Sequence, residues 1–594
     1  MCGVNGFNFR DENLVQKMDQ VTAHRGPDQS AFWCDEKISL GHNRLAIIDL
    51  SPRGVQPMWD AAHEVVIVFN GEIYNYQELR SELEVEYQFN SQSDTEVILN
   101  AYKKYGAECL NKFNGIFAFA IWDTRTEELF LTRDRMGVKP LYYFFDGARF
   151  IFSSEIKGIL EHVVSREVDR QAFNLFFQLL YVPEPLTMFK NILKLPAAHY
   201  AILKENKLEI KKYWDSAPDF LPCPKKSYQQ TVAEIRETFR DSVKHQLISD
   251  RPVGIFLSGG LDSTAVLGAA VEFHSGPIKT FSVGFKDSID PKKFNADFDL
   301  ARQTAAYYKT DHHELLVGPN DIWNEIEQIV WHLDEPNFNP TAGAIYLLSK
   351  YAKQSVAVVL GGDGADELFG GYPRYYYSRL MGLFLFDEKR VLRFLAQKSD
   401  HLEKIISANI YHPTQAAENL QQRYFINAKN RPCDFENYFM RIDREGWLAD
   451  ESLLRSDKMT MANGVEARVP ILDYRLVKLS ETIPVKWKFN LWQNPKNFQG
   501  KKIWKEAIKS YLPEHVLNQQ KRGWFTPMAK WLRGELRAPV YEILQQAKQN
   551  ITHFNPEGIE EMWQKHLTGQ VYNLNSIWAI VMWQLWYNKF FKKM

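Results

Sequence analysis

The sequence has no strong charge of either sign and few cysteines. Its 72 Lys and Arg residues against 73 Asp and Glu residues give a formal net charge of −1, so no overall field attracts nucleic acid or an anionic membrane. Only five cysteines occur in 594 residues, at positions 2, 34, 109, 223 and 433, and their spacing forms neither a disulfide framework nor a CxxC metal site. We therefore expect a protein of the reducing cytoplasm that acts on small molecules and has no nucleic-acid partner.

The sequence also shows no pattern that predicts an export signal or a membrane-spanning segment. The N-terminus has no basic segment followed by an apolar one, so we expect no signal peptide. The most apolar late stretch, residues 576–587 (SIWAIVMWQLWY), is interrupted by Gln584 and is shorter than the roughly 20 residues that span a bilayer. We predict a buried helix there and no membrane partner.

The chain is long enough for at least two domains. Between residues 64 and 155, short apolar runs are separated by Gly, Asp and charged turns, and a capping-box pattern at Ser93-Asp94-Thr95-Glu96 precedes a helical stretch. This pattern predicts an α+β domain over residues 2–214, followed by a proline-containing linker at residues 221–227. From residue 228 strand candidates alternate with helices, which predicts an α/β domain over residues 228–594 with a parallel sheet and a mostly helical part from about residue 372.

Cys2 is the first candidate for catalysis. Removal of Met1 would leave Cys2 with a thiol and a free α-amine, whose pKa of roughly 7.7 to 8 suits it to accept the thiol proton near neutrality. Cysteine at the second position can equally occur by chance. The rest of the chain must decide between these interpretations.

Two glycine-rich acidic loops predict a nucleotide site. Residues 258–263 (SGGLDS) follow one strand candidate and open a helix, a context in which backbone N–H groups and the helix N-terminus bind phosphate. The loop lacks the lysine of a P-loop, so a different bond of ATP is expected to break. Asp262, and a second loop at residues 361–367 (GGDGADE), indicate Mg²⁺ held between carboxylates and phosphates at the carboxyl ends of parallel strands.

These motifs together resemble the glutamine-hydrolysing asparagine synthetases, a class II glutamine amidotransferase family, over nearly the whole chain. The resemblance rests on the two loops and on the following segments: Met1-Cys2-Gly3, His24-Arg25-Gly26-Pro27-Asp28, Arg44-Leu45-Ala46-Ile47-Ile48-Asp49, Asn70-Gly71-Glu72-Ile73-Tyr74-Asn75 and Ser93-Asp94-Thr95-Glu96. It implies an N-terminal-nucleophile glutaminase with an αββα sandwich, followed by an ATP pyrophosphatase domain.

The resemblance also implies roles for residues of the first domain. Cys2 would attack the glutamine amide, with Asn70 and the Gly71 N–H as the oxyanion hole. Arg44 would bind the α-carboxylate of glutamine, and Asp94, helped by Glu72, its α-ammonium. An ordinary surface ion pair is the alternative for Arg44 and Asp94.

In the second domain the resemblance implies an ATP site. Leu257, Val283 and Gly362 would hold the adenosine part, and Asp262 and Asp366 would bind Mg²⁺. Lys501 matches a phosphate-binding lysine, with Lys502 as a rival, and either could be a surface residue. The segment Glu466-Ala467-Arg468-Val469-Pro470 and Asp473 also match, although a structural salt bridge would explain them equally well. The expected pyrophosphate-binding and loop residues are Ser258, Gly259, Gly260, Leu261, Asp262, Ser263 and Gly361.

The implied reaction is ATP-dependent amidation of aspartate to asparagine, with glutamine-derived ammonia, through an aspartyl-adenylate. Glutamine, aspartate and ATP would be the small-molecule partners, a homodimer is compatible with the prediction, and ammonia would pass between the domains in a sheltered route. The main alternative is an amidotransferase of this architecture with another acceptor, such as a sugar acid. A tRNA-modifying ATP pyrophosphatase and a non-catalytic protein are more distant alternatives, disfavoured by the neutral charge and by the intact Cys2 and acidic loops.

Overall fold

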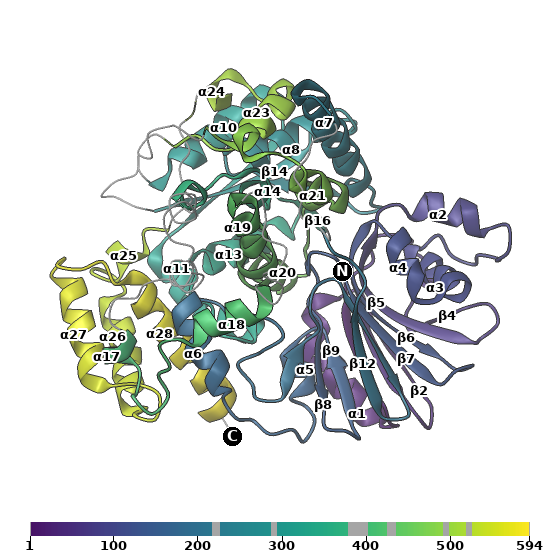
Figure 1. Cartoon of the computed structure of the whole chain (residues 1–594), viewed down its shortest axis with the longest axis horizontal. Coiled ribbons are helices and arrows are strands. Elements are labelled where there is room, and N and C mark those ends of the chain that lie inside the picture. The colour runs from purple at the N-terminus through teal and green to yellow at the C-terminus, as the bar shows by residue number, and fades with distance from the viewer. Residues whose placement is uncertain are drawn as a thin grey trace.

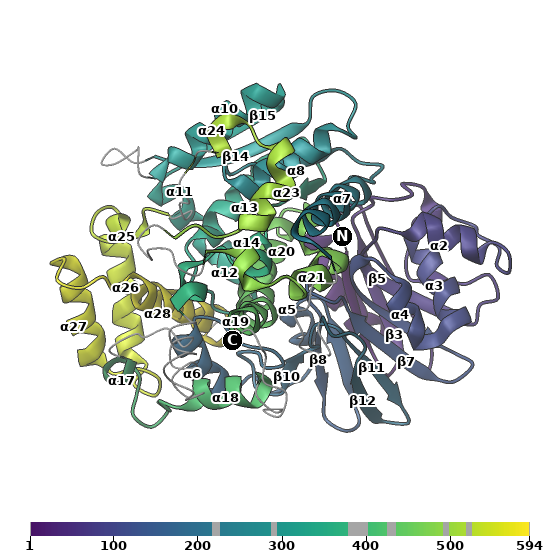
Figure 2. The same ribbon diagram turned by 45° about the horizontal axis from the view of Figure 1, so that its top comes forward.

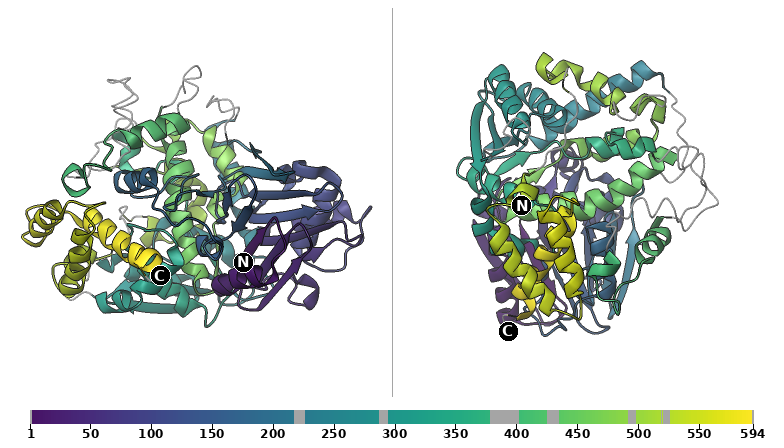
Figure 3. Two further views of the ribbon diagram at one scale, coloured as in Figure 1. Left: turned by 90° about the horizontal axis from the view of Figure 1, so that it is seen from below. Right: turned by 90° about the vertical axis from the view of Figure 1, so that its left-hand side faces the viewer.

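The computed structural model places an antiparallel sandwich beside a parallel sheet with its helices. It describes residues 2–216, 226–286, 294–377, 402–424, 435–490, 498–517, 519 and 526–592. The N-terminus lies where the sandwich meets the rest of the chain, as the views in Figures 1 and 3 agree. Most of the predicted linker at residues 221–227 lies outside the described residues, and the predicted domain boundary stays a prediction.

The first sheet of the sandwich has six strands in the order β10-β8-β9-β1-β3-β2, and every neighbouring pair is antiparallel. Its strands are β1 (Gly3–Phe7), β2 (Gln29–Cys34), β3 (Ser39–Arg44), β8 (Tyr142–Phe145), β9 (Phe150–Ser153) and β10 (Ile192–Lys194). Cys2 therefore stands directly before a central strand.

The second sheet also has six antiparallel strands, in the order β12-β11-β7-β6-β5-β4. They are β4 (Met58–Trp59), β5 (Val65–Ile73), β6 (Gly115–Asp123), β7 (Glu128–Arg133), β11 (His199–Lys204) and β12 (Lys207–Lys212). Asn70, Gly71 and Glu72 lie near the end of β5.

Alternating side chains of β5 explain the four layers. Val66 and Val68 face the other sheet and join an apolar core with Val4 of β1, whereas Ile67 and Phe69 face the helices. Helices α2 (Tyr76–Leu83) and α3 (Asp94–Tyr105) cover the second sheet, and α1 (Glu12–Thr22) and α5 (Ile156–Ile159) cover the first. The αββα sandwich expected from the sequence is confirmed.

The start of α3 differs from the predicted capping box. Ser93 Oγ accepts the N–H of Thr95 at 3.1 Å, one residue earlier than a capping box requires. The carboxylate of Glu96 turns away from Ser93 and accepts the N–H groups of Asn90 and Ser91 at 2.8 and 2.7 Å. Glu96 therefore fixes the loop before the helix instead of its first turn.

The second region is built on a five-stranded parallel sheet in the order β15-β14-β13-β16-β17, as predicted except for the unpredicted short edge strand β17. Val358 of β16 packs with α7 (Tyr228–Gln246), α8 (Leu261–Val271) and α10 (Ala296–Tyr308), whereas its neighbour Val359 packs with α13 (Thr341–Ala352) on the other face. The strands are β13 (Val253–Phe256), β14 (Lys279–Phe285), β15 (Asp311–Val317), β16 (Val358–Leu360) and β17 (Glu466–Arg468).

The C-terminal part is helical, and α26 (Arg537–Gln549), α27 (Pro556–Leu567) and α28 (Leu574–Tyr587) pack together at the end of the molecule away from the sandwich (Figures 1 and 2). The apolar stretch at residues 576–587 lies in α28, and most of its side chains are buried. This confirms the predicted buried helix. Among the described residues, no helix has the length and apolarity that crossing a membrane requires.

Candidate functional site

Cys2 and Asn70 meet between the two sheets of the sandwich. The backbone N–H of Cys2 donates to Asn70 Oδ1 at 3.0 Å, and both residues are buried. The side-chain Nδ2 of Asn70 donates no hydrogen bond to any described residue. A buried donor without an acceptor costs free energy, so Nδ2 is available for an oxygen of a bound substrate.

Gly71 supplies the second predicted donor. Its φ of +151° lies outside the range that other residues adopt readily, and a Cβ there would approach Ile116 O to 2.0 Å. Only glycine therefore lets β5 run this close to β6 beside Asn70. The structure brings Asn70 and Gly71 together with Cys2, and their catalytic roles remain predictions.

The thiol of Cys2 does not ionise readily by itself. Burial raises its pKa, although the backbone of Leu45 and the charge of Arg44 act in the opposite direction. Since the thiolate is the nucleophilic form, the thiol needs a base, which a free α-amine would supply.

Arg44, at the end of β3, is buried without an acidic partner. Its guanidinium donates to the carbonyl of Ser51 at 3.1 Å and to the carbonyl of Asp49, and no carboxylate of the described chain lies within ion-pair distance of it. A buried charge without a counter-ion is costly unless a ligand brings one. This placement rules out the surface ion pair that the sequence had left as an alternative.

Asp94 is the acidic counterpart, at the first position of α3. Its Oδ2 accepts the N–H of Ile73 at 2.9 Å, and no cationic side chain of the described chain pairs with it. Burial raises its pKa to about 6. Arg44 and Asp94 thus give the sandwich one unpaired buried charge of each sign, which is what the carboxylate and ammonium of an amino acid require.

Glu72 shares its neighbourhood with two residues of the parallel sheet, Glu466 and Arg468. Arg468 Nε donates to Glu466 Oε1 at 2.5 Å, whereas its NH2 lies 3.5 Å from Glu72 Oε1. Burial and Glu466 raise the pKa of Glu72, while Arg468 overcomes burial and lowers the pKa of Glu466 to about 2. Glu72 lies beside Arg468, whereas Asp94 has no cationic partner in the described chain, so Asp94 is the better candidate for binding an ammonium.

The first glycine loop joins β13 to α8. Ser258 Oγ and Ser263 Oγ lie 2.9 Å apart, and Ser263 Oγ also accepts the N–H of Ser258 at 3.2 Å, so the loop closes on itself. Gly259 has a φ of +72°, and a Cβ there would meet Asp297 O at 2.1 Å. No side chain of the described chain caps α8, so its first N–H groups can receive an anion.

The second glycine loop lies against the first, as the parallel sheet requires. Strands β13 and β16 are neighbours, and a Cβ on Gly362 would lie 2.7 Å from the backbone N of Ser263. Gly361 N donates to Arg468 O at 2.9 Å, which ties this loop to β17. Leu257 directly follows β13 and its N donates to Phe281 O at 2.9 Å, and the other predicted adenosine residue, Val283, lies in the neighbouring strand β14.

Lys501 joins the acidic residues of both loops. Its Nζ lies 2.6 Å from Asp262 Oδ2 and 2.8 Å from Asp366 Oδ1. Burial alone would lower the pKa of Lys501, but the two carboxylates outweigh it and hold the pKa above the ordinary value. Lys501 is buried and Lys502 is exposed, so the geometry favours Lys501 for the phosphate role.

Asp262 and Asp366 have a donor set that suits Mg²⁺. Both carboxylates contact one ammonium nitrogen, so they converge on a common point, and about a fifth of each side chain is exposed. The described residues contain no group of three or more His, Cys, Asp or Glu side chains placed to hold a metal. Two carboxylates suffice for Mg²⁺, which completes its coordination with phosphate and water oxygens.

The sequence interpretation missed two neighbours of this cluster. Trp504 Nε1 donates to Asp262 Oδ1 at 2.9 Å, and its ring stacks on Phe369 of α14 (Ala365–Phe369) at 4.9 Å. Trp504 stands one helical turn after Lys501, and this i, i+3 spacing could have revealed it. Glu367, with its pKa raised to about 7 by burial and by Asp366, accepts from Tyr372 at 2.9 Å.

Comparisons with known proteins agree with this architecture. The sequence model of the glutamine amidotransferase domain matches residues 1–214, and that of asparagine synthase matches residues 234–588. Asparagine synthetase (glutamine-hydrolyzing) 1 of Bacillus subtilis (strain 168) is 33% identical over 631 aligned residues, which cover 99% of this chain and 96% of that protein. Amidase chyE of Penicillium rubens is 27% identical over 93% of this chain and 92% of its own.

Among solved structures, glutamine phosphoribosylpyrophosphate amidotransferase from B. subtilis, complexed with ADP and GMP, is 14% identical with a TM-score of 0.29, covering 53% of this chain and 81% of its own. The chain belongs to the glutamine-hydrolysing asparagine synthetases, a family of enzymes.

Proposed function

We propose that this enzyme transfers the amide nitrogen of glutamine to aspartate and uses ATP, releasing asparagine, glutamate, AMP and pyrophosphate. The observation that carries the proposal is that one chain contains the residues of both a candidate glutamine site and a candidate ATP site. Arg44 and Asp94 offer unpaired buried charges in the same sandwich as Cys2, and Lys501 joins two acidic glycine loops at the parallel sheet. Relatives named as asparagine synthetases favour aspartate over another acceptor carboxylate.

In the glutaminase half, Cys2 would be the nucleophile. After loss of Met1, the α-amine takes the thiol proton and sulfur attacks the side-chain carbonyl of glutamine. Asn70 Nδ2 and the Gly71 N–H stabilise the oxyanion, the C–N bond breaks, and ammonia leaves with the proton. Water then cleaves the thioester to glutamate and returns the thiol. The support is the unpaired Asn70 Nδ2 beside Cys2.

In the synthetase half, the aspartate side-chain carboxylate would attack the α-phosphorus of ATP. The bond to pyrophosphate breaks, and the acyl-adenylate forms with a good leaving group. The N–H groups that open α8 and the ammonium of Lys501 stabilise the charge on the phosphates. Asp262 and Asp366 would hold Mg²⁺, which when bound neutralises phosphate charge.

Ammonia links the two halves. It must attack the acyl carbon before it is protonated, because ammonium has no lone pair. It then displaces AMP and loses a proton to give the amide. The extensive contact between the sandwich and the parallel-sheet region, where Arg468 meets Glu72, supports a sheltered transfer over release into water.

The test supplies purified enzyme with glutamine, ATP, Mg²⁺ and one carboxylate at a time, either aspartate or a sugar acid. We expect pyrophosphate and asparagine in a 1:1 ratio with aspartate and only background pyrophosphate with the sugar acid. Glutamine hydrolysis with no asparagine, or pyrophosphate release that prefers the sugar acid, would reject the proposal.

A further inference from the structure

The backbone of Cys2 is held at both of its polar groups. Its N–H donates to Asn70 Oδ1 at 3.0 Å, and its carbonyl accepts from Arg25 Nε at 3.1 Å. After the proposed loss of Met1, no preceding residue would restrain Cys2. These two contacts and the peptide bond to Gly3 must therefore set the direction of the thiol, and small errors in such a direction slow catalysis strongly.

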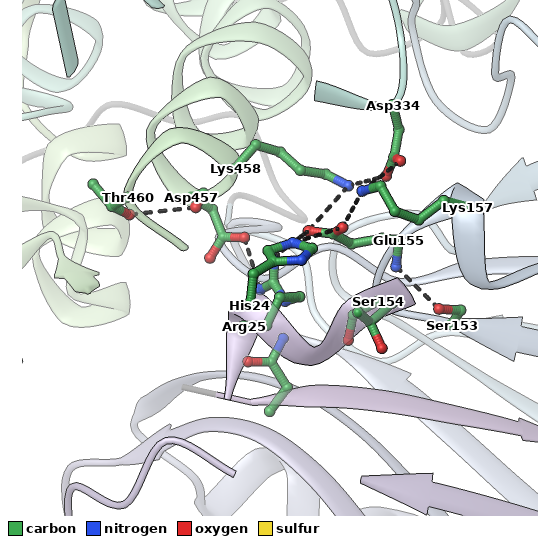
Figure 4. Close-up of polar contacts among 12 residues, drawn as sticks. His24, Arg25, Ser153, Ser154, Glu155, Lys157, Asp334, Asp457, Lys458 and Thr460 are labelled. Carbon is green, nitrogen blue, oxygen red and sulfur yellow. Dashed lines mark hydrogen bonds and ion pairs between the residues drawn. The ribbon is translucent and has the colours of Figure 1, made fainter. Parts of the chain in front are cut away.

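Arg25, at the end of the short 3₁₀ helix η1 (Ala23–Arg25), divides its donors among three acceptors. Besides the Cys2 carbonyl, NH1 donates to Glu155 Oε1 at 3.1 Å and NH2 to Asp457 Oδ2 at 2.9 Å (Figure 4). The side chain is completely buried. Because the guanidinium is a rigid planar fork, the two carboxylates fix the direction of the third donor.

Asp457 belongs to the other half of the enzyme. It lies on α20 (Leu454–Met461), 432 residues after Arg25, and its second oxygen accepts from Lys139 Nζ at 3.3 Å. Lys458, the next residue of α20, pairs with Asp334, which also holds Lys157 at 2.8 Å (Figure 4). Helix α20 thus contacts the sandwich through two adjacent residues. Asp457 pairs with Arg25 directly, whereas Lys458 and Lys157 reach Arg25 only through Glu155, which lies 3.9 Å from Lys458.

We propose that Asp457 is a positioning residue for the glutaminase, acting through Arg25 on the carbonyl of Cys2. The glutaminase site is then complete only with a carboxylate from the synthetase half in place. A carboxylate that served only to join the domains would need no contact with the residue that holds Cys2. Asp450 is such a carboxylate, because it accepts the N–H of Glu184 at 3.0 Å and lies 3.6 Å from Lys194 Nζ. The inference rests on the proposed role of Cys2.

Asp457→Asn in the full-length enzyme tests it, because asparagine keeps the shape and removes the charge that orients Arg25. We expect the kcat for glutamate release to fall about 10- to 100-fold with little change in the KM for glutamine, since Arg44 and Asp94 are untouched. Alkylation of Cys2 by iodoacetamide should slow and its pH profile should shift. Asparagine synthesis from ammonium should stay within about twofold of wild type, which also shows that the variant is folded.

Asp450→Asn is the matched control, an equal charge change at a buried carboxylate of the synthetase half that contacts the sandwich but neither Arg25 nor Glu155. Arg25→Lys should reproduce the defect, because lysine lacks the fork, and Asp457→Glu should restore part of the rate. The inference is overturned if Asp457→Asn and Asp450→Asn lower kcat equally, or if Asp457→Asn leaves it unchanged. Cys2→Ala separates the two proposals: glutamate release by that variant would remove the proposed function itself.

If Asp457→Asn does not fold, Arg25→Lys decides alone. A loss of glutamate release with intact ammonium-dependent synthesis supports positioning, and unchanged glutamate release overturns it.

Discussion

The buried carboxyl of Asp94 is predicted to lower the stability of the free enzyme, although the same group is proposed to bind glutamine. Its carboxyl is buried, and burial raises its pKa from 3.8 to about 6 in the folded protein. Because the folded pKa is the higher one, the protonated form favours folding, and this stabilisation is lost as the pH rises from about 3.8 through about 6. This rise in the pKa of Asp94 lowers the free energy of unfolding by about 3 kcal/mol at pH 7.5 and by about 1.5 kcal/mol at pH 5.

Asp94→Asn should therefore stabilise the free enzyme. The amide is neutral at every pH, and its oxygen can still accept the N–H of Ile73. For a unit of about 200 residues, 3 kcal/mol raises the thermal midpoint by roughly 6–12 °C at pH 7.5, and the gain should halve at pH 5. Thermal unfolding of both proteins at the two pH values measures this, with Glu205→Gln at an exposed turn as the control that should show no pH-dependent gain.

The same substitution should impair glutamine use. The ionised carboxylate of Asp94 is the proposed partner of the substrate ammonium, so the wild-type KM for glutamine should rise about tenfold for each pH unit below about 6. In Asp94→Asn the KM should be high at every pH and lose this dependence. The reasoning is refuted if Asp94→Asn is less stable than wild type at pH 7.5, or if its KM for glutamine is unchanged.

Two further predictions address the other catalytic groups. Asn70→Ala removes the unpaired Nδ2 donor and should lower the kcat of glutamate release by about 10²–10³, while asparagine synthesis from ammonium remains; equal losses from both nitrogen sources would contradict the oxyanion role. Lys501→Met should lower pyrophosphate formation at least about 100-fold, whereas Lys502→Met should stay within about twofold, because only Lys501 reaches Asp262 and Asp366; the reverse result would move the phosphate role to Lys502.

The sequence predicts local structure well where residues that are close together in the chain determine it. The apolar run from Val65 to Phe69 predicts a strand, whose two faces are both buried in the structure, and the glycine loop at residues 258–263 predicts a strand-to-helix turn. Both predictions follow from residue types within a short segment. The capping box at Ser93 was wrong in detail because Glu96 finds two backbone N–H groups in the preceding loop, a choice that tertiary structure makes.

Long-range charge placement could not be predicted. The sequence favours Lys501 but leaves Lys502 as a rival, and only the fold shows that Lys501 is buried between two carboxylates. The contact of Arg25 with Asp457 spans 432 residues, and no local pattern specifies such a pair. The structure brings Cys2 beside Asn70 and the two glycine loops beside each other, as their motifs suggest, whereas the contacts that join the halves depend on how two domains pack.

The most direct test of the account follows the nitrogen atom. Wild-type enzyme and Cys2→Ala are supplied with aspartate, ATP, Mg²⁺ and glutamine labelled with ¹⁵N in the side-chain amide, and then with unlabelled ammonium added. The account predicts ¹⁵N-asparagine from the wild type, and from Cys2→Ala only unlabelled asparagine once ammonium is present. Labelled asparagine from Cys2→Ala, or labelled ammonia without labelled asparagine from the wild type, would contradict it.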